Sequence, residues 1–131
     1  MTYNLFISHS WTYGDAYEKL VSMLNRAPNF TYKNYSVPKN DPIHNANNDR
    51  ELKAAIRNQM QHASCVLIMA GKYASYSKWI QIEIALAQEM GKRIIAVEPW
   101  GAEQTSVVVK QAANIKAGWN TASIVSAIKG Y

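Results

Sequence analysis

The chain has 131 residues, of which 48% are hydrophobic, and it carries a formal net charge of +5. This length and composition are typical of a globular protein, so we expect a single domain over residues 1–131 with one core. No apolar run approaches the roughly 20 residues that a membrane span needs. The first residues also lack a basic region followed by an apolar stretch, so the sequence predicts no secretory signal.

The cysteine and histidine content argues against a disulfide and against a metal. The single cysteine, Cys65, lies in the apolar run SCVLIMA, so we expect it in the core and the protein in a reducing cytoplasm. His9, His44 and His62 are scattered, and no CxxC or HExxH motif occurs. The sequence therefore predicts no metal site.

The basic residues are dispersed along the chain. A charge of +5 attracts phosphate groups, nucleic acid or an acidic partner. However, no Lys/Arg-rich run and no zinc-finger or RNA-binding signature is present. A solvated basic surface is therefore a better interpretation than a nucleic-acid groove.

The first third of the chain reads as strand, helix and strand. Residues 3–8 form a short apolar strand. The next helix, which Asp15 can cap and Pro28 closes, has apolar residues at i, i+3, i+4 and i+7. A weaker strand over residues 32–37 precedes a polar loop over residues 38–49.

The middle of the chain repeats this alternation. Residues 50–62 have helical spacing, and residues 64–70 are almost entirely apolar, as expected of a central parallel strand that is covered on both faces. After a loop over residues 71–76, a second helical segment follows. Ser77 can cap it and Gly91 can end it.

The last part of the chain consists of short elements. Residues 93–97 predict a buried strand, residues 106–113 a short helix and residues 115–117 a small edge strand. Asn120 can cap a final helix. Strands that alternate with helices indicate an α/β fold, a parallel sheet with helices on both faces. We expect a flavodoxin-like sheet of about five strands in the order 2-1-3-4-5.

Glu83 is a carboxylate on an apolar helix face. Helical spacing gathers apolar side chains around it: Trp79, Ile82, Leu86, Ala87 and Met90. A buried carboxylate is costly unless it is paired or hydrogen-bonded, so a functional site is one interpretation. The other is a structural glutamate bonded to a buried backbone group or to an arginine.

The predicted topology also places a cleft. In open α/β sheets, ligands bind beyond the carboxyl ends of the strands, where the loops over residues 8–14, 38–49 and 71–76 begin. The polar and aromatic side chains that can converge there are Ser8, His9, Ser10, Asp41, Tyr73, Ser77, Trp79 and Glu83.

These cleft residues also have structural interpretations. Trp79 can stack on a ring of a ligand or pack in the core. His9 can orient a phosphate or make one backbone bond. Ser8 and Ser10 can bind ribose or phosphate or form a turn, and Asp41, which precedes a proline, favours a turn.

Four segments of the chain, FISHSW, NYSVPKNDP, SKWIQIEI and AVEPWG, resemble the TIR-like family. The resemblance is closest to the short bacterial TIR proteins of Thoeris anti-phage defence and runs from about Tyr3 to the final helix. The most specific element is the Trp-x-x-x-Glu spacing of Trp79 and Glu83. The chain departs from many TIR domains at Ile80, where they have cysteine, and in the loop PKNDPIHNANN.

The resemblance implies an enzyme that cleaves the bond between nicotinamide and ribose in NAD. Members of the family release ADP-ribose, or form cyclic isomers or conjugates, and in Thoeris the nucleotide activates a separate effector. The family's catalytic glutamate corresponds to Glu83. The family's first-strand motif, which borders the nucleotide pocket, corresponds to Phe6, Ser8, His9 and Ser10. No GxGxxG or Walker sequence is present, so NAD would be a substrate and no cofactor is expected.

Three hypotheses for the function follow. The first is this NAD-consuming enzyme. The second is a non-catalytic signalling module that acts through TIR-TIR assembly. The third, a nucleic-acid binder or nuclease, is disfavoured because neither clustered Lys/Arg nor a carboxylate pair for a metal is present.

Overall fold

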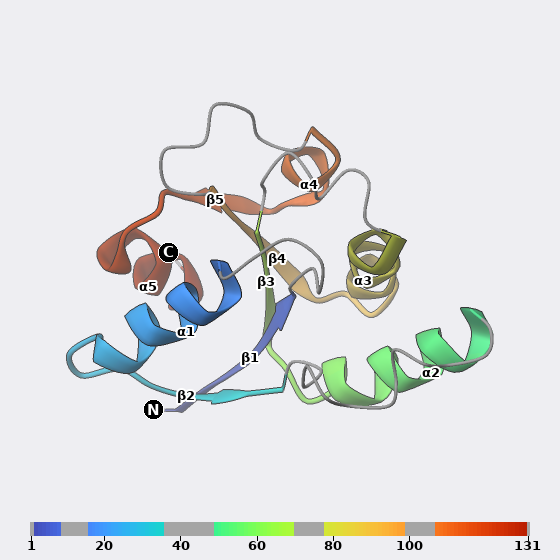
Figure 1. The fold of residues 1–131 in the computed structure, drawn as a ribbon, viewed down its shortest axis with the longest axis horizontal. Helices are drawn as coiled ribbons and strands as arrows, with labels where there is room; N and C mark the ends of the chain where they lie inside the picture. Colours follow the sequence, from blue (N-terminus) through green and yellow to red (C-terminus); the bar gives the residue numbers. More distant parts are fainter. Residues whose placement is uncertain (1, 9–15, 36–48, 70–77, 99–106, 131) are drawn as a thin grey trace.

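The computed structural model of the protein describes residues 2–8, 16–35, 49–69, 78–98 and 107–130. A five-stranded parallel sheet runs in the order β2-β1-β3-β4-β5 (Figure 1). Its strands are β1 (Thr2–Ser8), β2 (Thr31–Asn34), β3 (Cys65–Met69), β4 (Arg93–Val97) and β5 (Ile115–Ala117). The helices are α1 (Ala16–Arg26), α2 (Asp49–Met60), α3 (Lys78–Glu89), α4 (Val107–Ala112) and α5 (Thr121–Ile128). The predicted flavodoxin-like strand order is confirmed.

The helices cover the two faces of the sheet, with α1 and α5 on one face and α2, α3 and α4 on the other (Figure 1). Along β1 the side chains alternate: Leu5 and Ile7 pack with α1 and α5, whereas Phe6 packs with α2, α3 and α4. This period of two places Ser8, the last residue of β1, on the same face as α3.

The second strand differs from the prediction. It spans Thr31–Asn34, whereas residues 32–37 were expected. The backbone N–H of Tyr35 still donates to the carbonyl of Leu5, and residues 36 and 37 lie outside the described residues. β2 pairs with β1 at the edge of the sheet and is largely exposed. Few of its side chains need to be apolar, so the sequence pattern defines the end of this strand poorly.

The end of α3 is formed by the predicted glycine. Gly91 has a φ of 69°, which is the left-handed conformation. The N–H of Gly91 donates to the carbonyl of Gln88 at 3.2 Å, and that of Lys92 donates to Ala87 at 2.8 Å. These two bonds form a Schellman motif, which satisfies carbonyls in the last turn and ends the helix.

The start of α5 is formed by the predicted asparagine. Asn120 has an extended backbone, and its side-chain oxygen accepts from the N–H of Ser123 at 2.8 Å. This is the ordinary geometry of an N-cap. The other two expected caps, Asp15 and Ser77, lie outside the described residues. No helix in the described ranges is long and apolar enough to cross a membrane.

Cys65 is a core residue, as predicted. It is buried at the start of β3, on the face covered by α1 and α5. Burial raises the pKa of its thiol from 9.0 to about 11, because water no longer solvates the thiolate, and the nearby Arg93 only partly offsets this.

The buried thiol makes a labelling prediction. At pH 8 only about one folded thiol in a thousand is ionised, so iodoacetamide should not label native protein but should label it fully in denaturant. Between pH 9.0 and about 11 the unfolded chain loses a proton that the fold retains, so stability should fall across this range. Cys65→Ala should lack this part of the pH dependence in thermal unfolding. Equal labelling of native and denatured protein would contradict the assignment.

Gly91→Ala tests the helix end. A Cβ at this position meets no described atom within 4 Å, so the cost comes from the positive φ alone. We expect a loss of about 1 kcal/mol in the free energy of unfolding in urea. Gly118→Ala is the matched control, because Gly118 lacks a positive φ and its Cβ would make only an ordinary contact at 3.5 Å. An equal loss in both variants would count against the Schellman assignment.

Candidate functional site

A buried hydrogen bond joins the end of β1 to α3. The Ser8 hydroxyl donates to Oε1 of Glu83 at 2.5 Å. The two side chains are 0% and 1% exposed and are the buried polar or charged residues of the described core. The bond links two parts of the chain that are 75 positions apart. Two of the residues expected in the cleft therefore lie in direct contact.

The surroundings of Glu83 are apolar. Its helix contributes a set of buried side chains, which are Ile80, Ile82, Ile84, Leu86 and Ala87. A carboxylate among such groups loses the solvation that water would give, so it needs hydrogen-bond donors inside the protein. The Ser8 hydroxyl is one of them, and bonds to charged groups are stronger than bonds between neutral ones.

α3 is more deeply buried than its sequence pattern predicts. The expected apolar face did not include Ile80 and Ile84, yet they are 2% and 6% exposed. The reason is that α3 contacts α2 on one side and α4 on the other, in addition to β4 (Figure 1). Glu83 itself is 1% exposed, so the prediction that it is buried is confirmed.

The pair lies at the topological switch point of the sheet. β1 and β3 are neighbours in the sheet, and the chain leaves β1 for one face and β3 for the other. In doubly wound folds the crevice between two such strands, at their carboxyl ends, is where ligands bind. Ser8 ends β1, and Glu83 lies in the helix that follows β3.

The other predicted site residues are placed to different degrees. Phe6 is fully buried two positions before Ser8 on the same face, in the apolar cluster that includes the buried residues of α3. Trp79 belongs to α3, one turn before Glu83, and its side chain lies outside the described residues. Also outside are His9, Ser10, Asp41, Tyr73 and Ser77. Their proposed contacts with a substrate stay predictions.

The structure gives Ser8 a role that the sequence pattern did not indicate. Ser8 was expected to bind ribose or phosphate or to form a turn, whereas its hydroxyl donates to Glu83. One signal could have indicated this contact. Phe6 and Ser8 share a strand face by alternation, and this is the face that the helix after β3 covers.

Comparison with known proteins identifies the family. The family described as "Thoeris protein ThsB, TIR-like domain" matches residues 6–104, which is more than half of the chain. The chain belongs to this family. No curated protein matches it. The family assignment confirms the resemblance seen in the sequence and supports a role in anti-phage defence.

The match to the Thoeris TIR-like domain has informative limits. It begins at Phe6 and includes both Ser8 and Glu83, so the buried pair lies within the part of the chain that matches the family. It ends at residue 104, before β5 and α5, although the sequence resemblance was expected to continue to the last helix.

In the described residues, no three His, Cys, Asp or Glu side chains are grouped as metal ligands would be.

A double-mutant cycle tests the buried pair. Ser8→Ala removes the donor from a buried carboxylate and should lower the free energy of unfolding by about 2 kcal/mol. Glu83→Gln keeps the shape and an accepting oxygen but removes the charge. In the Glu83→Gln background, Ser8→Ala should lower the free energy of unfolding by about 1 kcal/mol less, because a hydrogen bond to a neutral amide is weaker than one to a carboxylate. Urea unfolding of the four proteins measures this difference, and an equal cost in both backgrounds would contradict the contact.

Proposed function

We propose that this TIR-like domain cleaves NAD between nicotinamide and ribose and makes a cyclic or conjugated ADP-ribose signal. The single observation that carries the proposal is the buried Glu83 carboxylate, held by Ser8 at the switch point of the sheet. Membership in the Thoeris TIR-like family supports the same reaction class. NAD is the substrate, and no bound cofactor is part of the proposal.

The chemistry requires a fixed negative charge. When the bond between C1′ of ribose and the nicotinamide nitrogen breaks, nicotinamide leaves as a neutral base with the electron pair. Positive charge then develops on the ribose, as in glycoside cleavage through an oxocarbenium-like state. A carboxylate that is already oriented in a water-poor site stabilises this charge more than one in bulk water. In the proposal, Glu83 supplies the charge.

Ser8 contributes orientation. A glutamate side chain has three rotatable bonds, and the hydrogen bond to Oε1 restricts them before the substrate arrives. The apolar residues of α3 exclude water and so strengthen electrostatic interactions at this position. Ser8 is thus a positioning residue, and Glu83 is the proposed catalytic residue.

The second half of the reaction determines the product. Attack of water on C1′ would give ADP-ribose, whereas attack by a nucleophile of the same nucleotide would give a cyclic isomer. Attack by a separate acceptor would give a conjugate. In a defence system, a diffusible nucleotide made in this way would reach a separate effector protein, and contacts between TIR domains would assist assembly of the active form.

Glu83→Gln tests the catalytic assignment. It keeps the size and a hydrogen-bond acceptor but removes the charge, so NAD turnover by purified protein should fall by about a hundredfold or more. Circular dichroism should remain that of the wild type. Glu89→Gln is the matched control: it removes a carboxylate from the same helix, but an exposed one that pairs with Arg57. Its turnover should remain that of the wild type.

The possible results separate the two main hypotheses. Turnover lost only in Glu83→Gln supports the enzyme. Equal NAD turnover by the wild type and Glu83→Gln would contradict the assignment of Glu83 as catalytic. If the wild type consumes no NAD in any state of assembly, the chain acts as a non-catalytic TIR-like module through protein contacts.

A further inference from the structure

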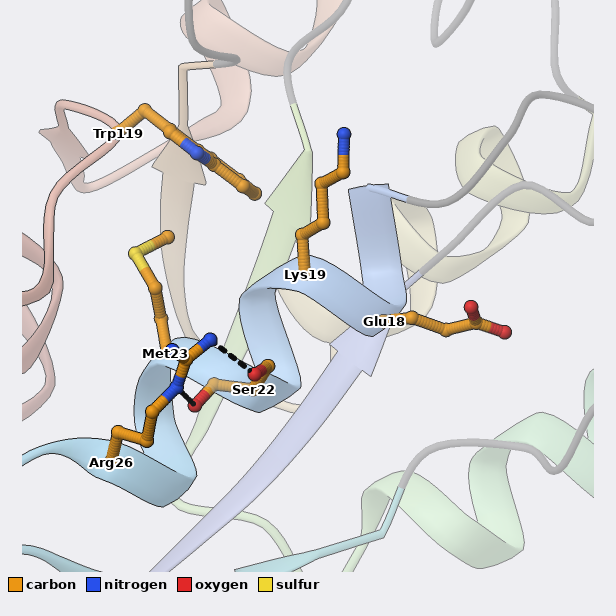
Figure 2. Close-up of a pocket in the computed structure, with 6 residues that line it drawn as sticks. All are labelled: Glu18, Lys19, Ser22, Met23, Arg26 and Trp119. Carbon is orange, nitrogen blue, oxygen red and sulfur yellow. Dashed lines mark hydrogen bonds between the residues drawn. The ribbon is translucent and has the colours of Figure 1, made fainter.

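A hollow lies on the face of the sheet that is opposite to Glu83. It has a volume of about 390 Å³ and lies beside α1, where Trp119 approaches from the segment between β5 and α5 (Figure 2). Its lining consists of Glu18, Lys19, Ser22, Met23, Arg26 and Trp119. α1 and α5 cover this face, whereas α3 covers the other. The hollow is therefore separated from the proposed catalytic site by the sheet.

One wall of the hollow is apolar and partly aromatic. Trp119 and Met23 both pack at the margin of the core under α1 and α5, and both remain partly exposed. Figure 2 shows the flat indole ring and the thioether on the same side of the hollow. A partly exposed indole and a polarisable sulfur are suited to contact with a planar ring.

The hollow also carries positive charge, and the charge of Arg26 is held in position by hydrogen bonds. Nε of Arg26 donates to the carbonyl of Ser22 at 3.3 Å, and a terminal nitrogen donates to the Ser22 hydroxyl at 2.6 Å (Figure 2). These bonds use two of the five N–H groups of the guanidinium. They also fix the plane of the guanidinium, and so the directions of its other three N–H groups. Lys19 lies seven positions earlier, two turns along the same helix face. Figure 2 shows the Glu18 carboxylate pointing away from the other labelled side chains.

We propose that this hollow binds a small anionic molecule with a planar ring, the chemical class of the nucleotides. The indole of Trp119 would contact the ring, Arg26 would bind the anionic group, and Lys19 would add positive charge to the hollow. The volume of about 390 Å³ fits a small ligand, for which pockets span about 300–1,000 Å³. Along α1, Met23 lies between Lys19 and Arg26, so the apolar part of the lining has a cation on each side. The proposal stands apart from NAD cleavage, because no residue of the hollow belongs to the proposed catalytic site.

Calorimetric titration with AMP tests this site. AMP carries a ring and an anion but lacks the nicotinamide bond, so it is not consumed. We expect AMP to bind the wild type more tightly than adenosine or inorganic phosphate, which each supply only one half of the recognition. Arg26→Gln should weaken AMP binding by about tenfold, because the protein loses a charged hydrogen-bond donor to the phosphate. Trp119→Leu, which keeps an apolar side chain, should weaken it by about fivefold.

Two comparisons make the test decisive. Lys116→Gln is the matched control: it removes an exposed cation on β5 outside the hollow and should leave AMP affinity unchanged. Arg26 is exposed on α1, so Arg26→Gln should fold even if Trp119→Leu does not. Loss of binding in Arg26→Gln with retention in Glu83→Gln supports the second site. Absent binding, or binding that Arg26→Gln leaves unchanged while Glu83→Gln abolishes it, would overturn the proposal.

Discussion

The hydrogen bond between Ser8 and Glu83 is the interaction on which the architecture of the site depends. A carboxylate that is 1% exposed can remain in a packed core only with donors beside it. That requirement fixes the register of β1, because a shift by one residue would turn Ser8 towards α1 and α5. It also fixes the rotation of α3, because Glu83 must face the carboxyl end of β1. The fold and the proposed catalysis therefore both require Ser8 and Glu83 in this arrangement.

The sequence predicted the features that depend on local pattern. Apolar runs gave the central strands, and Gly91 and Asn120 gave a helix end and a helix start that the structure confirms. Glu83 was predicted to be buried from helical spacing alone, since Trp79, Leu86 and Ala87 lie three or four positions from it. These predictions succeeded because capping and periodicity are decided within one or two turns of the chain.

Features that depend on contacts between distant segments could not be predicted in this way. The burial of Ile80 and Ile84 results from α2 and α4 packing on both sides of α3, which the spacing within α3 does not encode. The partner of Ser8 is 75 positions away, so its spacing in the motif FISHS could not distinguish a ligand contact from a contact with Glu83. The end of β2 was missed because an edge strand has only one neighbour to define it.

We propose that this Thoeris TIR-like domain uses the Glu83 carboxylate to convert NAD into a nucleotide signal. The most direct measurement follows NAD and ADP-ribose-like nucleotides by mass spectrometry in cells that express the wild type or Glu83→Gln, with and without phage infection. If Glu83 is catalytic, a nucleotide should appear on infection with the wild type and be absent with Glu83→Gln. Identical nucleotide profiles for the two proteins in both conditions, with both proteins folded, would contradict it.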